Sequence, residues 1–179
     1  LLCILVGSGL FAAEFNKAAF RILSAIGALV ILVTLLNLIL HESNNLSILT
    51  FFLNTLFFII VTIALVAHVA KAKDVDGSTL LCAINSYLLI GLTLSIMFMI
   101  MDLFFPGSFE QVDTGTGKFS TFVYYGFITL TTLGYGDITP STAMARSLSA
   151  FTALFGQLYL VIIMALIIGK FLITKKAEE

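Results

Sequence analysis

The most informative segment of the chain is Thr131-Thr132-Leu133-Gly134-Tyr135-Gly136-Asp137. It ends an uncharged segment, residues 119–136, that begins with aromatic residues and finishes with two closely spaced glycines. Glycine disfavours helix, and non-helical backbone is tolerated at membrane depth only where protein covers it or water reaches it. In a membrane-embedded chain this segment is therefore predicted to be re-entrant, with a short helix going in and an extended strand coming back.

The composition of the chain places it in a membrane. Hydrophobic residues make up 60% of the 179 residues and charged residues 11%, whereas soluble domains have about 45–50% and about a quarter. The mean hydropathy is +1.12. So few polar side chains cannot cover a water-facing surface, which excludes a soluble globular enzyme. The net charge of −1 offers no basic surface to a nucleic acid.

Four uncharged runs are long enough to cross a bilayer, which takes about 20 mostly apolar residues. These runs are residues 22–40, 46–70, 79–101 and 147–169. The sequence thus predicts an all-α membrane protein with four transmembrane helices and the re-entrant segment. A fifth run, residues 1–13 of a short N-terminal segment 1–19, is too short to span. A truncated helix, an interfacial helix and part of a signal segment all remain open for it.

The basic residues set the expected topology. They flank the predicted helices in three clusters: Lys17 with Arg21, Lys71 with Lys73, and Lys170 with Lys175 and Lys176. All three clusters fall on one side of the membrane if residues 119–136 are re-entrant and not spanning. We therefore expect a multi-pass protein of the cell membrane with a cytoplasmic C-terminus.

The glycine-rich strand has a specific physical use. A dehydrated cation needs oxygen ligands, and backbone carbonyls supply them without net charge. Successive carbonyls aim at one axis when the backbone alternates between right- and left-handed conformations, which glycine adopts freely. Gly134 and Gly136 lie at alternate positions, and the Thr132 hydroxyl adds one further oxygen. A ring of carbonyls needs several copies of the chain, so a symmetric oligomer is expected.

The seven residues resemble TTVGYGD, the signature of the potassium-channel pore family, at six of seven positions. The resemblance extends over about residues 79–175 and implies a tetramer that conducts K⁺ passively across the lipid bilayer. It implies that the carbonyls of Thr132, Leu133, Gly134 and Tyr135 bind K⁺, and that Gly136 closes the outer end. Leu133 replaces the usual Val, and its side chain is expected to point away from the ions into packing behind the strand.

The resemblance also assigns the segments around this strand. The apolar runs and basic clusters predict a hairpin (20–70) and a cytoplasmic linker (71–78), and the resemblance implies a pore domain (79–175) after them. Its parts are outer helix 79–105, loop 106–118, pore helix 119–131, filter segment 132–137 and inner helix 143–173. Tyr124, Tyr125, Thr131 and Asp137 are expected to support the filter segment, with a hydrogen bond from the Tyr124 hydroxyl to Asp137. Ile128 stands where some relatives have Glu, so a buried carboxylate pair with Asp137 is not expected.

Gly156 follows Gly136 by 20 residues and matches the hinge glycine of the family's inner helix. An isolated glycine within a helix costs about 1 kcal/mol relative to alanine, so its presence needs a reason. One interpretation is a bend that opens an inner gate. The other is close helix packing, since glycine is common in membrane helices for that purpose.

The hairpin is informative for what it lacks. Residues 22–40 and 46–70 contain no Arg or Lys, whereas a voltage sensor needs several charges in the membrane field. Voltage-sensor gating is therefore not expected. Family members often carry a cytoplasmic regulatory domain after the inner helix; we expect either that such a domain is missing from this chain or that gating is intrinsic.

Three other functions were weighed. A weakly selective monovalent cation channel is disfavoured by Tyr135, which such relatives often replace. A membrane subunit of a potassium uptake system would carry several pore segments in one chain, and this chain has one. A membrane enzyme is not expected, since the sequence has no Ser/His/Asp set, no HExxH motif and no Cys/His cluster. No cofactor is expected besides the K⁺ ions.

Overall fold

The computed structural model describes residues 17–40, 44–71, 77–112 and 117–178. Most of the N-terminal segment expected over residues 1–19 lies outside the described residues. The same holds for residues 72–76 of the linker and residues 113–116 of the loop before the pore helix.

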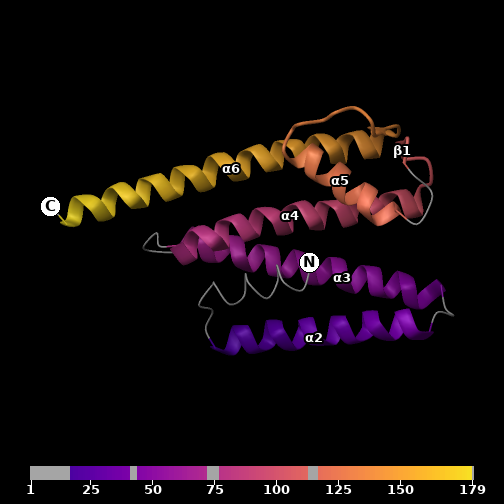
Figure 1. Ribbon diagram of the computed structural model, residues 1–179, viewed down its shortest axis with the longest axis horizontal. Helices are drawn as coiled ribbons and strands as arrows, with labels where there is room; N and C mark the ends of the chain where they lie inside the picture. Colours follow the sequence, from indigo (N-terminus) through magenta and orange to yellow (C-terminus); the bar gives the residue numbers. More distant parts are fainter. Residues whose placement is uncertain (1–16, 41–43, 72–76, 113–116, 179) are drawn as a thin grey trace. The chain divides into compact units, whose positions relative to one another are not determined.

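The described chain is mostly helical (Figure 1). Its elements are α2 (Lys17–Leu40), α3 (Asn44–Lys71), α4 (Gly77–Phe104), β1 (Phe109–Glu110), α5 (Lys118–Leu130), β2 (Thr139–Pro140) and α6 (Ala143–Glu178). The bounds of α4 and α5 lie within two residues of those expected for the outer and pore helices. The inner helix, expected to end at residue 173, continues to Glu178, because the last residues include Lys, Ala and Glu, which are good helix formers.

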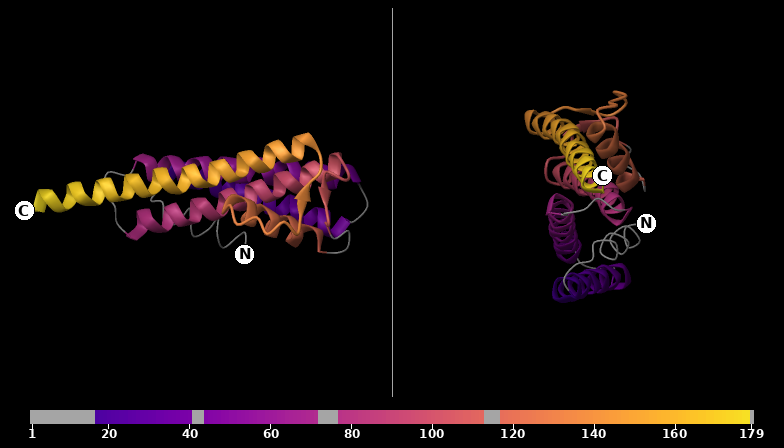
Figure 2. Two further views of the ribbon diagram at one scale, coloured as in Figure 1. Left: turned by 90° about the horizontal axis from the view of Figure 1, so that it is seen from above. Right: turned by 90° about the vertical axis from the view of Figure 1, so that its left-hand side faces the viewer.

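A pair of short strands is present that the all-α expectation did not include. β1 and β2 pair antiparallel, with Phe109 opposite Pro140 and Glu110 opposite Thr139. They lie side by side near the first turns of α6 (Figure 2). Strands of two residues are too short to produce a hydrophobic period, which explains why the sequence pattern gives no sign of them. The pair ties the residues after the filter segment to the chain that follows α4.

The chain packs as two compact units, and the border between them falls within α4, between Leu89 and Ile90. The sequence had suggested a border at the linker, residues 71–78. The difference arises because α4 is one continuous helix whose first half belongs with the hairpin and whose second half belongs with the C-terminal residues.

The first unit contains the helical hairpin of α2 and α3. A polar bridge joins these two helices: Asn54 Nδ2 donates to Thr34 Oγ1 at 3.2 Å and to the Thr50 carbonyl at 2.8 Å. In lipid the hydrophobic effect does not drive helices together, so such hydrogen bonds and close packing hold them. The bridge thus gives the hairpin a contact that fixes how the two helices pair.

The second unit packs α5 against the second half of α4 through small residues. A Cβ on Gly91 would lie 2.6 Å from the Phe127 ring, and a Cβ on Gly126 would overlap the Ser95 hydroxyl. That hydroxyl donates to the Gly91 carbonyl at 2.7 Å. Small side chains let two membrane helices approach closely enough for their backbones to pack. This seam holds the pore helix at a fixed depth along α4.

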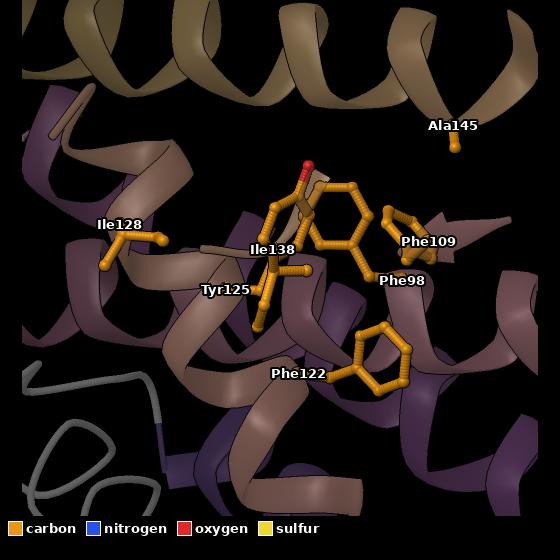
Figure 3. Close-up of a cluster of buried hydrophobic side chains, with 7 residues drawn as sticks. All are labelled: Phe98, Phe109, Phe122, Tyr125, Ile128, Ile138 and Ala145. Atoms are coloured by element: carbon orange, nitrogen blue, oxygen red, sulfur yellow. The ribbon is translucent and has the colours of Figure 1, made fainter. Parts of the chain in front are cut away.

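An aromatic cluster forms the core of the second unit (Figure 3). Phe98 and Phe109 meet the Tyr125 ring edge to face, with ring centres 4.9 and 5.2 Å away. Edge-to-face pairs add about 0.5–1.5 kcal/mol beyond the area that they bury. The buried members come from α4, β1, α5, the residue after Asp137 and α6: Phe98, Phe109, Phe122, Tyr125, Ile128, Ile138 and Ala145. The core therefore joins α5 to Ile138, the residue that follows the outer end of the filter segment.

Among the described residues, three helices are long and apolar enough to cross a membrane: α4, residues 52–71 of α3 and residues 143–169 of α6. In α2 the apolar stretch among those residues is Ala25–Leu36, which is shorter than a span. The fourth span, expected over residues 22–40, therefore remains a prediction, although α2 is helical for 24 residues.

Candidate functional site

The filter segment, residues 132–137, begins where α5 ends. Thr131 is the last residue with right-handed backbone, and Thr132 follows with a φ of 60°. Behind it, the Leu133 N–H donates to the Ile128 carbonyl at 2.9 Å and the Thr132 N–H donates to the Thr129 carbonyl at 3.0 Å. These two bonds form a Schellman motif, which satisfies carbonyls that a helix end otherwise leaves unpaired. The helix therefore builds the first turn of the filter segment.

Threonine is unusual at the left-handed position of such a motif. Glycine is the normal residue there, and an L-residue with a Cβ costs about 1–2 kcal/mol. The β-branched Thr132 therefore brings strain, and its side chain must offset that cost. Its hydroxyl oxygen accepts a hydrogen bond from Gln157 Nε2 of α6 at 3.1 Å.

The backbone of the filter segment alternates in handedness. φ is 60° at Thr132, 49° at Gly134 and 79° at Gly136, whereas the intervening Leu133 and Tyr135 do not have positive φ. This is the alternation that the sequence analysis required for carbonyls that aim at one axis. Two of the three left-handed positions carry glycine, which adopts that conformation without strain.

The side chains of the filter segment are not packed within the chain. Leu133 is 55% exposed and Tyr135 is 67% exposed. The sequence analysis expected Leu133 to pack behind the strand, and within the described chain that packing is absent. Two large apolar side chains this exposed need a cover that the chain itself does not provide.

The outer end of the segment is held by Asp137. Its Oδ2 accepts a hydrogen bond from the Tyr124 hydroxyl at 2.5 Å, and its Oδ1 accepts one from the Ile138 N–H at 3.2 Å. The hydrogen bond to Asp137, with desolvation and the carboxylate charge, raises the pKa of Tyr124 to about 12. Tyr124 lies on α5, outside the three membrane-length helices, and stays protonated at physiological pH. The structure thus brings together the pair that the sequence analysis proposed.

Tyr125 and Thr131, also expected to support the filter, make different contacts. The Tyr125 hydroxyl lies 2.7 Å from Ser149 Oγ on α6, and Figure 3 shows it pointing toward that helix. Because Ser149 Oγ donates to the Ala145 carbonyl at 2.8 Å, Tyr125 is the donor of this bond. The Thr131 hydroxyl donates back to the Phe127 carbonyl of its own helix at 2.8 Å. Tyr125 therefore braces α5 against α6, and Thr131 caps α5.

Gly156 lies where α6 passes closest to the end of α5. A Cβ at this position would overlap the Leu130 carbonyl oxygen. α6 continues as a helix through this residue. The contact supplies the packing reason for a glycine that the sequence analysis left open, and the role as a hinge stays a prediction.

Two polar residues of α6 make contacts that were not predicted from the sequence. Gln157 contacts Thr132, and Ser149 contacts Tyr125. The signal was available, because a glutamine in the uncharged apolar run 147–169 is costly in lipid and indicates a polar partner or water.

Among the described residues no group of three or more His, Cys, Asp or Glu side chains is placed to hold a metal ion.

These features define a class of protein. A short helix that ends in a strand of alternating handedness, between two helices of membrane length, is the architecture of a membrane protein with a re-entrant pore loop. The profile of a family described as "Ion channel" matches residues 83–173, which is half of the chain. The chain therefore belongs to this ion-channel family, the pore-domain family of two-helix potassium channels.

The family is one of ion channels and not of enzymes, so the protein is a multi-pass membrane channel without enzyme activity. Comparison with curated proteins gives no match, and comparison with solved structures gives none. The matched range begins within α4 and includes α5, the filter segment and most of α6. It does not include α2 or α3.

Proposed function

We propose that the protein is a potassium-selective channel that works as a homotetramer and conducts K⁺ passively. The observation that carries the proposal is the alternating backbone, with positive φ at Thr132, Gly134 and Gly136. A backbone of this kind turns successive carbonyls to one side, where they replace the water of a dehydrated cation without adding charge.

The ligands of K⁺ in this proposal are the carbonyl oxygens of Thr132, Leu133, Gly134 and Tyr135, with Gly136 closing the outer end. The C-terminal end of α5, which carries a partial negative charge, lies at the start of this segment and favours a cation there. Asp137, Tyr124, Tyr125 and Thr131 support the segment through the contacts described above. No cofactor besides K⁺ is required.

The exposed surfaces support assembly from several copies. One chain provides one wall of carbonyls, and it leaves Leu133 and Tyr135 without cover. In the most apolar stretch of α6, within residues 143–169, 22% of the residues are buried inside the chain, so most of them need a partner or lipid. Lipid does not suit the exposed, polar Thr132 and Gln157, which need water or protein. Four copies around a water-filled cavity meet all of these needs.

Gating by a voltage sensor is not part of the proposal. Residues 22–40 and 46–70 carry no Arg or Lys, so movement of these two runs transfers almost no charge through the field. The basic residues beside the helices favour a cytoplasmic C-terminus in the cell membrane.

The test is the reversal potential of the purified protein in planar bilayers under opposed K⁺ and Na⁺ gradients. We expect a value near the K⁺ equilibrium potential. Measurable current with a reversal near zero would replace the proposal by a weakly selective monovalent cation channel. Tetramer assembly is tested separately, by native mass spectrometry of the detergent-solubilised protein.

A matched pair of variants ties the current to the backbone. Gly134→Ala places a Cβ at a left-handed position where no atom of the chain lies within 4 Å, so its effect within the chain comes from backbone strain alone. We expect this variant to lose K⁺ selectivity. Gly169→Ala, which also adds its Cβ into open space but lies in helix α6, should conduct as the unaltered protein does.

A further inference from the structure

Residues 156 and 157 of α6 hold the turn that starts the filter segment. The Leu130 carbonyl oxygen fills the space beside Gly156, and Gln157 Nε2 donates to Thr132 Oγ1 at 3.1 Å, across 25 residues of sequence. α6 therefore makes two contacts here, one with the last residue of α5 through backbone packing at Leu130 and one with the first filter residue through the hydrogen bond to Thr132.

Both residues that form this hydrogen bond are unusual at their positions, which indicates that the bond has a role. Gln157 is an amide in a run of apolar residues, and such a side chain needs a polar partner or water. Thr132 occupies a left-handed position that glycine fills with less strain. The strained Thr132 and the polar Gln157 form one contact at the inner end of the filter segment.

A hydroxyl group has one donor hydrogen and two acceptor lone pairs. The Gln157 N–H occupies one lone pair of Thr132 Oγ1, which limits how the hydroxyl can rotate and leaves the second lone pair for another partner. Within the part of the chain that the structure describes, Gln157 Oε1 has no hydrogen-bond partner. Two oxygens with free acceptor capacity thus lie next to each other at this end.

We propose that Gln157 is a positioning residue for the innermost cation site: its amide N–H fixes the Thr132 hydroxyl so that the oxygen faces the ion. The proposal rests on the proposed function, because it assumes that the filter segment binds K⁺. Gln157 acts through Thr132 and sets how readily a cation passes between the cavity and the filter.

The test is a double-mutant cycle read by single-channel K⁺ conductance. Gln157→Met keeps the length of the side chain and removes the N–H, and Thr132→Val keeps the shape and removes the hydroxyl. We expect Gln157→Met to lower conductance about 2- to 12-fold, the range that one hydrogen bond supports. In the Thr132→Val background the same change should have no further effect, since the partner is already gone.

A conservative variant separates positioning from packing. Thr132→Ser keeps the hydroxyl, so Gln157→Met should lower conductance in that background by the same factor as in the unaltered protein. Val161→Met lies one turn further along the same face of α6 and removes no hydrogen bond, so it should leave conductance unchanged. Equal effects of Gln157→Met in the Ser and Val backgrounds would overturn the proposal, as would no effect in any background.

Assembly and ion selectivity are measured in separate experiments. Size-exclusion chromatography checks that each variant is a tetramer, and if Gln157→Met is not, Gln157→Asn replaces it because the shorter amide does not reach Thr132. The reversal potential of the unaltered protein tests the proposed function by itself. If the channel is K⁺-selective but its conductance does not depend on Gln157, this inference is wrong and the proposed function still holds.

Discussion

The Tyr124 hydroxyl donates to Oδ2 of Asp137 at 2.5 Å, which links the middle of α5 to the outer end of the filter segment. The carboxylate also accepts a hydrogen bond from the Ile138 N–H at 3.2 Å. The Asp137 side chain is therefore bonded both to α5 and to the residue that follows it. We expect Tyr124→Phe to loosen the outer end, so that K⁺ current decays faster during sustained opening in bilayer recordings. Tyr125→Phe removes the adjacent hydroxyl but leaves both hydrogen bonds of Asp137 in place, so it should change the decay less than Tyr124→Phe does.

The same pair has a defined pH dependence. The pKa of Tyr124 is raised to about 12 from a usual 10.0, chiefly by the hydrogen bond to Asp137. A raised pKa means that the contact is fully present below pH 10 and is lost as pH rises through 12. The difference in tyrosinate absorbance between the unaltered protein and Tyr124→Phe should therefore titrate near 12. A midpoint near the usual value would show that the hydrogen bond does not form in solution.

The bond from Tyr125 to Ser149 predicts an asymmetry in stability. Ser149→Ala leaves the buried Tyr125 hydroxyl without its acceptor, which costs about 1–3 kcal/mol. Tyr125→Phe removes the donor while Ser149 still donates to Ala145, so about 0.5–1.5 kcal/mol is expected. Denaturant unfolding in detergent gives the two values. The reverse order would mean that Ser149, and not Tyr125, depends on this bond.

Gly156→Ala is expected to destabilise the protein, because the new methyl group would overlap the Leu130 carbonyl oxygen. Overpacking of this kind costs about 1–3 kcal/mol. Gly169→Ala on the same helix meets no atom within 4 Å and should stabilise it, by about 1 kcal/mol. Thermal unfolding in detergent compares the two. If Gly156→Ala keeps its stability but stays closed in bilayers, the hinge interpretation is favoured over packing.

The ion pair between Lys118 Nζ and Asp102 Oδ2, 2.8 Å apart, joins the start of α5 to the end of α4. The side chain of Asp102 is 10% exposed and that of Lys118 is 39% exposed. Lys118→Met leaves a nearly buried carboxylate unpaired and should cost about 1–3 kcal/mol. Asp102→Asn leaves a lysine that reaches water and should cost under about 1 kcal/mol. Equal losses of unfolding free energy would mean that water already reaches Asp102.

Most of the fold could be predicted from the sequence, because each membrane helix requires a long run of apolar residues. The bounds of α4 and α5, and the alternating backbone expected around Gly134 and Gly136, follow from composition and from the freedom of glycine. The Tyr124 and Asp137 contact followed from the resemblance to the pore family. These features depend on residues near each other in the chain, where patterns are readable.

What the sequence did not predict depends on contacts between distant residues. The bonds from Gln157 to Thr132 and from Ser149 to Tyr125 join residues 25 and 24 positions apart, and no local pattern pairs them. The left-handed backbone at Thr132 was not predicted, because that conformation is normally adopted by glycine and is rare for a β-branched residue. The paired strands β1 and β2 are too short for a period to appear.

The Schellman motif at the end of α5 indicates which part of the filter segment forms first. The bonds that shape the inner turn of the filter segment, from Leu133 and Gly134 to Ile128, join residues five and six apart in one chain. Contacts this local close quickly and need no partner copy. The inner turn of the filter segment is therefore formed by bonds within a single chain. In the proposed tetramer, neighbouring copies would cover Leu133 and Tyr135, whose side chains a single chain leaves exposed.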